Sequence, residues 1–160
     1  ATLSSNAAQA AVNAAINYYN VDIMGGSLSY DLPDGVLEQL VPGVGGWQTL
    51  DVQADGIAGA YYGTDGTYVL VAQAQGEGTV TAAVAIDQLG IIVGLWLDTS
   101  NETPTIGAEF SEDLQYMNQY IGRENTNSVQ NVAGATHTSE GIKAAVDYAL
   151  AALPAAKEAT

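Results

Sequence analysis

Between Trp47 and Thr99 the chain consists of short segments rich in Val, Ile, Tyr and Trp, separated by Gly or Asp-Gly. Segments of this length and composition, with this punctuation, are typical of antiparallel strands joined by tight turns. The stretches "TDG" at 64–66 and "DQLG" at 87–90 have the composition of hairpin turns. The sequence therefore predicts an antiparallel meander, whose strands lie within 47–53, 59–63, 66–75, 78–87 and 90–99.

Alternation within the segment 67–75 indicates how the sheet is buried. Successive side chains of a strand point to opposite faces. One face carries Leu70, Ala72 and Ala74, and the other changes along the strand from valine at 69 and 71 to glutamine at 73 and 75. We therefore expect this second face to pass from core to solvent.

Helical periodicity occurs on both sides of the predicted sheet. Apolar side chains recur at helical spacing over 4–19, with Ala8, Val12, Ala15, Ile16 and Tyr19 on one stripe. A second stripe ends near Pro154 and consists of Ile142, Val146, Ala149, Leu150 and Leu153. These stripes predict a first and a last helix, each with one apolar face.

Two shorter helices are predicted between them. The stretch "VLEQL" at 36–40 interrupts the turn-rich segment 24–46. Ser111, followed by two acidic residues, indicates the start of a helix that reaches about Tyr120. The carboxylates of "EFSEDL" (109–114) are interpreted as residues of its first turn.

Helix, sheet, helix, helix is the order of an α+β fold. We expect a central antiparallel sheet flanked by an N-terminal helix and C-terminal helices. A length of 160 residues favours one domain over 1–160. Its N-terminal helix and turn-rich lead-in occupy 1–46, and the sheet, two loops and final helix occupy 47–160.

Charge excludes several classes of partner. The net charge is −15, and Arg123, Lys143 and Lys157 are the only Lys or Arg residues. Such a surface repels phosphodiester backbones and anionic lipids, so we expect no nucleic-acid partner. The longest strongly apolar run, 90–97, is far shorter than the roughly 20 residues that a membrane helix needs.

Reactive side chains are scarce. The chain has no cysteine, and His137 is its single histidine. This composition excludes disulfides and thiolate metal sites, and it removes the His clusters typical of zinc or copper sites. We predict no metal ligand and no catalytic residue.

The stretch "AGATHTSEGIKAAV" at 133–146 concentrates hydroxyl groups where the final helix begins. Thr138 or Ser139 can act as N-cap, and Gly134 allows close backbone approach to a ligand. The first N–H groups of a helix and its dipole attract anions, and Lys143 follows within the first turns. These features fit either an ordinary capped helix or a phosphate site.

Two motifs resemble those of a known family. "GATHTS" at 134–139 resembles the SGATxTS segment of FMN-binding domains in the flavin subunits of sodium-pumping NADH:quinone reductase and Rnf-type electron-transport complexes. "ETPTIG" at 102–107 resembles the ETPGxG motif that follows the central strands in that family. The order and spacing of both motifs match, and the resemblance covers roughly 56–150.

The resemblance implies FMN as cofactor, esterified through its phosphate to Thr136 by a separate flavin transferase. It also implies that both motifs surround the flavin. The cofactor-binding residues expected on this basis are Thr136, Gly134, Ala135, Thr138, Glu102, Thr103, Pro104, Thr105, Ile106 and Gly107.

Three positions depart from the family motifs. Ala133 stands where the family usually has Ser, Gln130 where it has Asp, and Thr105 where it has Gly. These departures leave a second class of function open: a self-assembling structural protein, outside the cell, that keeps the fold with or without flavin.

The resemblance further implies an electron carrier more than a stand-alone enzyme. We expect it outside the cytoplasm, in the periplasm, at the cell surface or in the medium. The expected partners are a redox protein or membrane electron-transport complex and the flavin transferase, and a homo-oligomer or filament is a further expectation.

Several other residues have two interpretations. Glu102 is either a hydrogen-bonding group at the flavin site or a solvated loop carboxylate. His137 is either an exposed loop residue or a proton relay beside the flavin. Four aromatic residues either stack on the flavin ring or pack in the core of the domain. They are Trp47, Trp96, Tyr61 and Tyr62.

Overall fold

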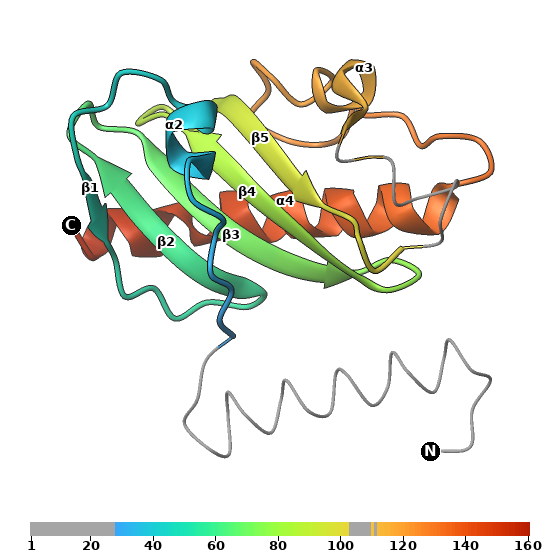
Figure 1. Ribbon diagram of the computed structural model, residues 1–160, viewed down its shortest axis with the longest axis horizontal. Helices are drawn as coiled ribbons and strands as arrows, with labels where there is room; N and C mark the ends of the chain where they lie inside the picture. Colours follow the sequence, from blue (N-terminus) through green and yellow to red (C-terminus); the bar gives the residue numbers. More distant parts are fainter. Residues whose placement is uncertain (1–27, 103–109, 111) are drawn as a thin grey trace.

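The computed structural model of the protein describes residues 28–102, 110 and 112–160. A five-stranded antiparallel sheet forms the centre, with neighbours in the order β1-β2-β3-β4-β5 (Figure 1). The strands are β1 (Trp47–Thr49), β2 (Ile57–Gly63), β3 (Tyr68–Gln75), β4 (Thr79–Ile86) and β5 (Ile92–Asp98). The helices are α2 (Val36–Leu40), α3 (Leu114–Met117) and α4 (Thr136–Glu158).

The sheet is the predicted meander, because each strand pairs with the next along the chain. The predicted turns at 64–66 and 87–90 connect β2 to β3 and β4 to β5. The longest ladder joins β3 and β4 without interruption from Tyr68↔Ile86 to Gln75↔Thr79. A tight turn, 76–78, therefore closes this hairpin. The α+β class and the central antiparallel sheet are confirmed.

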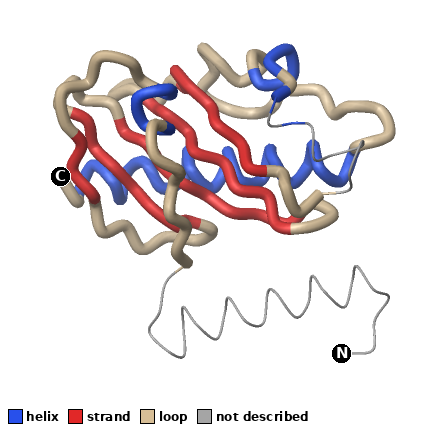
Figure 2. The backbone as a smooth tube through the Cα atoms, in the orientation of Figure 1, coloured by secondary structure: helices blue, strands red, loops and turns tan. Residues whose placement is uncertain are grey.

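Both faces of the sheet are buried along most of β3. Leu70 and Ala72 belong to the core beneath α4, whereas Val69 and Val71 belong to a second core beneath α2. Figure 2 shows α4 and α2 on opposite faces. Towards the end of β3 Gln73 is half-buried and Gln75 is exposed, so the predicted passage from core to solvent is confirmed.

Helix α4 covers one face of the sheet with the predicted apolar stripe. Ile142, Val146 and Ala149 are fully buried, and each buried Ile or Val contributes about 1.5–3 kcal/mol relative to an exposed one. The predicted end near Pro154 is wrong, since α4 continues to Glu158. Pro154 is exposed while Leu153 and Ala156 are buried, so apolar contact on the inner side offsets the hydrogen bond that proline removes.

The shorter helices differ in their agreement with the sequence. Helix α2 spans the predicted residues. Helix α3 ends at Met117, so a helix reaching Tyr120 is wrong. Beyond it, the chain turns to pair with the β5 edge: Gly122 N–H donates to Ile92 C=O (2.8 Å), and Ile92 N–H donates to Arg123 C=O (2.9 Å).

The predicted N-terminal helix over 4–19 lies outside the described residues, as do positions 24–27 of the turn-rich segment. Among the helices of the described part, none is long and apolar enough to cross a membrane.

Candidate functional site

The "GATHTS" segment forms the turn into α4 and its first residues. Gly134 has φ +82°, a left-handed conformation that glycine adopts without steric cost. Ala135 occupies the N-cap position, and Thr136 is the first helical residue, with an exposed side chain. The glycine therefore directs the chain into a helix that begins at Thr136.

The hydroxyl groups of this segment do not cap the helix as predicted. Thr138 and Ser139 lie inside the first turn, and both are buried. The N-cap residue Ala135 offers no side-chain hydrogen bond. The predicted N-cap at Thr138 or Ser139 is thus wrong, because the turn at Gly134 starts the helix two residues earlier than Thr138.

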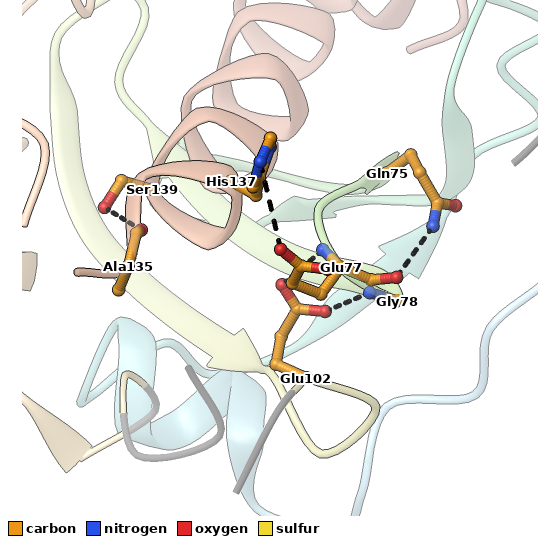
Figure 3. A network of polar contacts seen from close by, with 7 residues as sticks. All are labelled: Gln75, Glu77, Gly78, Glu102, Ala135, His137 and Ser139. Carbon is orange, nitrogen blue, oxygen red and sulfur yellow. Dashed lines mark hydrogen bonds and ion pairs between the residues drawn. The ribbon is translucent and has the colours of Figure 1, made fainter. Parts of the chain in front are cut away.

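Ser139 instead fastens the turn from within. Its hydroxyl donates to Ala135 C=O at 2.9 Å (Figure 3) and accepts from Val132 N–H at 3.0 Å. The first backbone bond at this end joins Ser139 N–H to Ala135 C=O at 3.0 Å. The N–H groups of Thr136, His137 and Thr138 find no acceptor among the described residues. Three donors thus remain at the positive end of the helix dipole.

Thr138 carries an unusual hydroxyl group. Its side chain is 1% exposed, and Oγ1 has no hydrogen-bond partner in the described part of the chain. An unpaired buried hydroxyl costs about 1–3 kcal/mol. The Thr138 hydroxyl is thus a buried donor without a partner among the described residues.

Glu102, the first residue of "ETPTIG", is 3% exposed. Its carboxylate accepts hydrogen bonds from the backbone N–H groups of Glu77 (3.0 Å) and Gly78, in the turn between β3 and β4 (Figure 3). Glu102 is therefore not a solvated loop carboxylate. A hydrogen bond from Glu102 to flavin stays a prediction.

The 76–78 turn is held from two sides. A Cβ atom at Gly76 would collide with the Glu102 carboxylate, and one at Gly78 would collide with Asn101 C=O. On the other side, a Cβ at Gly141 of α4 would lie 2.9 Å from the Cα and N atoms of Gly76. The turn thus connects the start of "ETPTIG" to the first turns of α4.

His137 extends from the first turn of α4 towards this hairpin. Its Nε2 lies 4.0 Å from Oε1 of Glu77, and its side chain is 74% exposed. Figure 3 shows the imidazole and the carboxylate facing each other. His137 is thus exposed, as one of its two interpretations predicted, but it lies in α4 and not in a loop, beside Glu77.

Sequence reasoning placed a connection between these two strands but did not identify the 76–78 turn as part of the site. The available signal was "GEG" between two strands, in which two glycines flank one charged residue. This pattern predicts a hairpin turn, but it does not predict the contact with Glu102, which lies 25 positions after Glu77 and 24 after Gly78.

The predicted residues Thr103, Pro104, Thr105, Ile106 and Gly107 lie outside the described residues.

Phe110, after this stretch, is buried and packs edge-on against Tyr116 with ring centroids 4.7 Å apart. Tyr116 and Tyr120 share a hydrogen bond of 2.7 Å between their hydroxyl oxygens. Burial raises the pKa of both phenols.

The aromatic candidates for ring stacking pack within the fold. Trp47, Tyr61 and Trp96 pack against the core on the α2 face, across the sheet from α4. Tyr62 packs on Tyr68 with ring centroids 4.9 Å apart, at the opposite end of β3 from the 76–78 turn. This arrangement favours the core-packing interpretation for all of them.

The cations lie away from the start of α4. Lys143 is seven residues beyond Thr136, about two helical turns. Arg123 is exposed in the segment beside the β5 edge. Backbone N–H groups and the Thr138 hydroxyl are therefore the donors nearest to Thr136 in sequence.

Comparison with known proteins agrees with this geometry. No curated protein matches the chain significantly. Residues 76–151 match the family of FMN-binding domains, so the matched segment begins at the glycine turn and ends within α4. It contains Glu102, Thr136 and the 76–78 turn. Residues 76–151 of this chain are therefore an FMN-binding domain, and FMN is its cofactor.

Proposed function

We propose that this protein is an electron-carrying flavoprotein in which the phosphate of FMN is esterified to Oγ1 of Thr136. The position of Thr136 carries the proposal: its side chain is exposed at the first residue of the 23-residue helix α4. A phosphodiester there meets backbone N–H groups and the positive end of the helix dipole.

The residues around Thr136 fit a phosphate group. Three N–H groups lack acceptors among the described residues, and the buried Thr138 hydroxyl lacks a partner there as well. Gly134 leaves the approach open, because no atom lies within 4 Å of the place where its Cβ would be. Anionic oxygens would satisfy donors that are otherwise unpaired.

Attachment requires an activated flavin nucleotide and a transferase. The bond from Thr136 Oγ1 to phosphorus forms, and the phosphoanhydride of the flavin nucleotide breaks. The proton of the threonine hydroxyl leaves with the released nucleoside monophosphate. The exposure of Thr136 supports this step, because a second protein must reach its hydroxyl.

Once bound, FMN supplies reversible electron chemistry, and the residues of the chain hold and orient it. The hairpin turn gives this end of the domain a rigid frame, since Glu102 and Gly141 contact it from opposite sides. A rigid frame favours electron transfer, because the protein around the cofactor then rearranges little when the redox state of the cofactor changes.

We also propose a location outside the cytoplasm and an electron-transfer partner, either a redox protein or a membrane electron-transport complex. The net charge of −15, with only three Lys and Arg residues, supports a partner with a cationic docking surface. Opposite charges accelerate encounter, so this association is expected to weaken as salt is added.

Intact mass and visible absorption test the attachment. The chain is produced together with a flavin transferase and precipitated with acid. We expect the flavin colour in the precipitate and a mass increase equal to FMN less one water. Thr136→Ala should lose both, whereas Thr49→Ala, at an exposed threonine of β1, should keep both.

Other outcomes distinguish the alternatives. Colour that leaves with the supernatant would show bound FMN without the ester. A colourless chain, despite a competent transferase and added FMN, would contradict electron transfer and favour the self-assembling structural protein. Flavin that stays with Thr136→Ala after acid would place the ester on another residue.

A further inference from the structure

The two faces of the sheet are covered unequally. Helix α4, with 23 residues, packs along one face, whereas α2, on the other face, has five. A Cβ atom at Gly94 of β5 would lie 2.9 Å from Leu40 C=O, so α2 lies over the β5 side of the sheet. An apolar sheet face has to be buried against another layer. Among the described helices, none covers the β1 and β2 side of the α2 face.

The segment 28–35, which leads into α2, crosses this face (Figure 1). Leu28, Tyr30 and Leu32 are half-buried against the core on the α2 face, and the residues between them are exposed. The Tyr30 hydroxyl donates to Oδ2 of Asp98 at 2.6 Å, and its ring centroid lies 6.2 Å from that of Trp96. The chain that precedes Leu28 therefore joins the domain on this face of the sheet.

Large apolar side chains stay partly exposed there. Strand residues on the same face, Trp47, Tyr61 and Trp96, are also half-buried. We call these three and the three of the segment 28–35 the aromatic face: Leu28, Tyr30, Leu32, Trp47, Tyr61 and Trp96. Partly exposed apolar residues that gather on one face indicate an interaction surface.

The segment 4–19 has the pattern needed to cover this surface. Its helical spacing places an apolar stripe on one side and amides on the other. The stripe consists of Ala8, Val12, Ala15, Ile16 and Tyr19, and the amides are Asn6, Gln9, Asn13 and Asn17. A helix of this length is about 24 Å long, and the eight-residue strands β3 and β4 are about 26 Å long. One such helix therefore matches the sheet in length.

The charge distribution also favours this segment. Positions 1–21 hold no Asp, Glu, Lys or Arg, whereas the whole chain carries 18 acidic residues. Burying an unpaired charge is costly, and further negative charge would be repelled by the domain. A segment without charges avoids both costs.

The connection is long enough for the segment to fold back. Eight residues, 20–27, join it to Leu28. Fully extended, eight residues span at most about 26–29 Å, roughly the length of the helix itself. They include Gly25 and Gly26, and glycine permits the backbone conformations of a sharp reversal.

We propose that the segment 4–19 forms a helix whose apolar stripe packs on the aromatic face of its own chain. The short connection gives the segment a high effective concentration at this face. Separate copies, each with a net charge of −15, repel one another instead. The helix lies across the sheet from α4, so it leaves Thr136 accessible, and the inference does not depend on FMN.

Quenching of tryptophan fluorescence by acrylamide tests the contact in the full, FMN-free chain. Both tryptophans of the chain belong to the aromatic face. Val12→Asp with Ile16→Asp places two carboxylates in the stripe, so we expect the quenching constant to rise about two-fold as the face becomes accessible. Asn13→Asp with Asn17→Asp adds the same charges at the same spacing on the opposite side and should leave it unchanged.

A spin label tests the contact without changing the stripe. The chain has no cysteine, so Asn13→Cys carries a single nitroxide. In the ¹⁵N-labelled chain we expect the indole N–H resonances of Trp47 and Trp96 to lose most of their intensity. The backbone amide of Ala151, on the exposed side of α4, should keep its intensity. A mixture of ¹⁵N-labelled chains without nitroxide and unlabelled chains with it should show no broadening.

Each other outcome overturns the inference. Broadening in the mixture equal to that in the doubly labelled chain would show that a second copy supplies the helix. Indole resonances of full intensity in the doubly labelled chain would show that the segment 4–19 does not pack on the aromatic face. Equal quenching of the two double variants would show that the stripe makes no contact there. Since all these measurements use the FMN-free chain, none of them bears on attachment at Thr136.

Discussion

The carboxylate of Glu102 accepts a hydrogen bond of 3.0 Å from the backbone N–H of Glu77, and so joins the loop after β5 to the turn between β3 and β4. The same carboxylate accepts from Gly78 N–H. On the other side, the turn touches Gly141 of α4. The 76–78 turn, which belongs to neither sequence motif, thus contacts both Glu102 of the first motif and the first turns of α4, where the second motif lies.

Removing this carboxylate should destabilise the domain. Glu102→Ala leaves two backbone N–H groups without their acceptor in a buried place, so we expect a loss of about 2–4 kcal/mol in the free energy of unfolding. Chemical denaturation of the FMN-free chain measures it. Glu124→Ala, at an exposed loop position, is the control and should change stability by less than about 0.5 kcal/mol. Equal stability of the two variants would contradict a structural role for Glu102.

Gly141→Ala tests the close approach of α4 to the hairpin. Alanine normally stabilises a helix interior by about 0.5–1 kcal/mol relative to glycine. Here the added Cβ would lie 2.9 Å from Gly76 backbone atoms. We therefore expect the opposite sign, a destabilisation of about 1–3 kcal/mol, because the helix must move away from the turn. A thermal or denaturant midpoint above that of the wild type would contradict the observed contact.

Thr138→Val should have opposite effects on the two forms of the protein. In the FMN-free chain it removes a buried hydroxyl without a described partner, so stability should stay equal or rise by about 1 kcal/mol. If the phosphate is attached at Thr136 as proposed and Thr138 donates to it, the variant loses that hydrogen bond, so the stabilisation gained upon loading should shrink. Denaturation curves of both forms measure the difference. An unchanged gain upon loading would show that this hydroxyl does not contact the phosphate.

Alkaline pH should weaken the fold through Tyr120. Burial, followed by the effect of Tyr116, raises its pKa in the folded state above the ordinary value of about 10. The unfolded chain therefore releases this proton first. The contribution of Tyr120 to the free energy of unfolding is fully present below about pH 10. Above that pH it falls, by up to about 1.4 kcal/mol per pH unit for one group.

Tyr120→Phe isolates this contribution. The variant loses the 2.7 Å hydrogen bond to Tyr116 and should be less stable at pH 7 by about 0.5–1.5 kcal/mol. Its stability should then decline less steeply than that of the wild type above pH 10. Unfolding free energies measured between pH 7 and about 11.5 give both slopes. Parallel slopes would assign the alkaline loss to other groups.

Local patterns in the sequence were enough to predict the sheet and the existence of the last helix. Hairpin turns such as 64–66 depend on the residues of the turn itself, and the alternation from Val69 to Gln75 depends on period two within one strand. These features can be predicted without knowing which distant segments are in contact, because the interactions that produce them act over a few residues.

Contacts between distant segments overruled local signals elsewhere. Pro154 ends a helix in most surroundings, yet α4 continues because Leu153 and Ala156 are buried. Serine is a residue type typical of N-caps, but Ser139 lies inside the first turn. There its hydroxyl accepts a hydrogen bond from Val132 N–H and donates one to Ala135 C=O. The helix reaching Tyr120 is cut short, since residues 122 and 123 pair with Ile92 of β5.

The candidate site shows the same division. Sequence motifs were sufficient to select Thr136 and Glu102 as candidates, because each motif consists of adjacent residues. The backbone partners of Glu102, and the burial of a Thr138 hydroxyl that has no partner among the described residues, appear only in the folded chain. Burial and hydrogen-bond partners are properties of packing between segments far apart in sequence, and no short pattern encodes them.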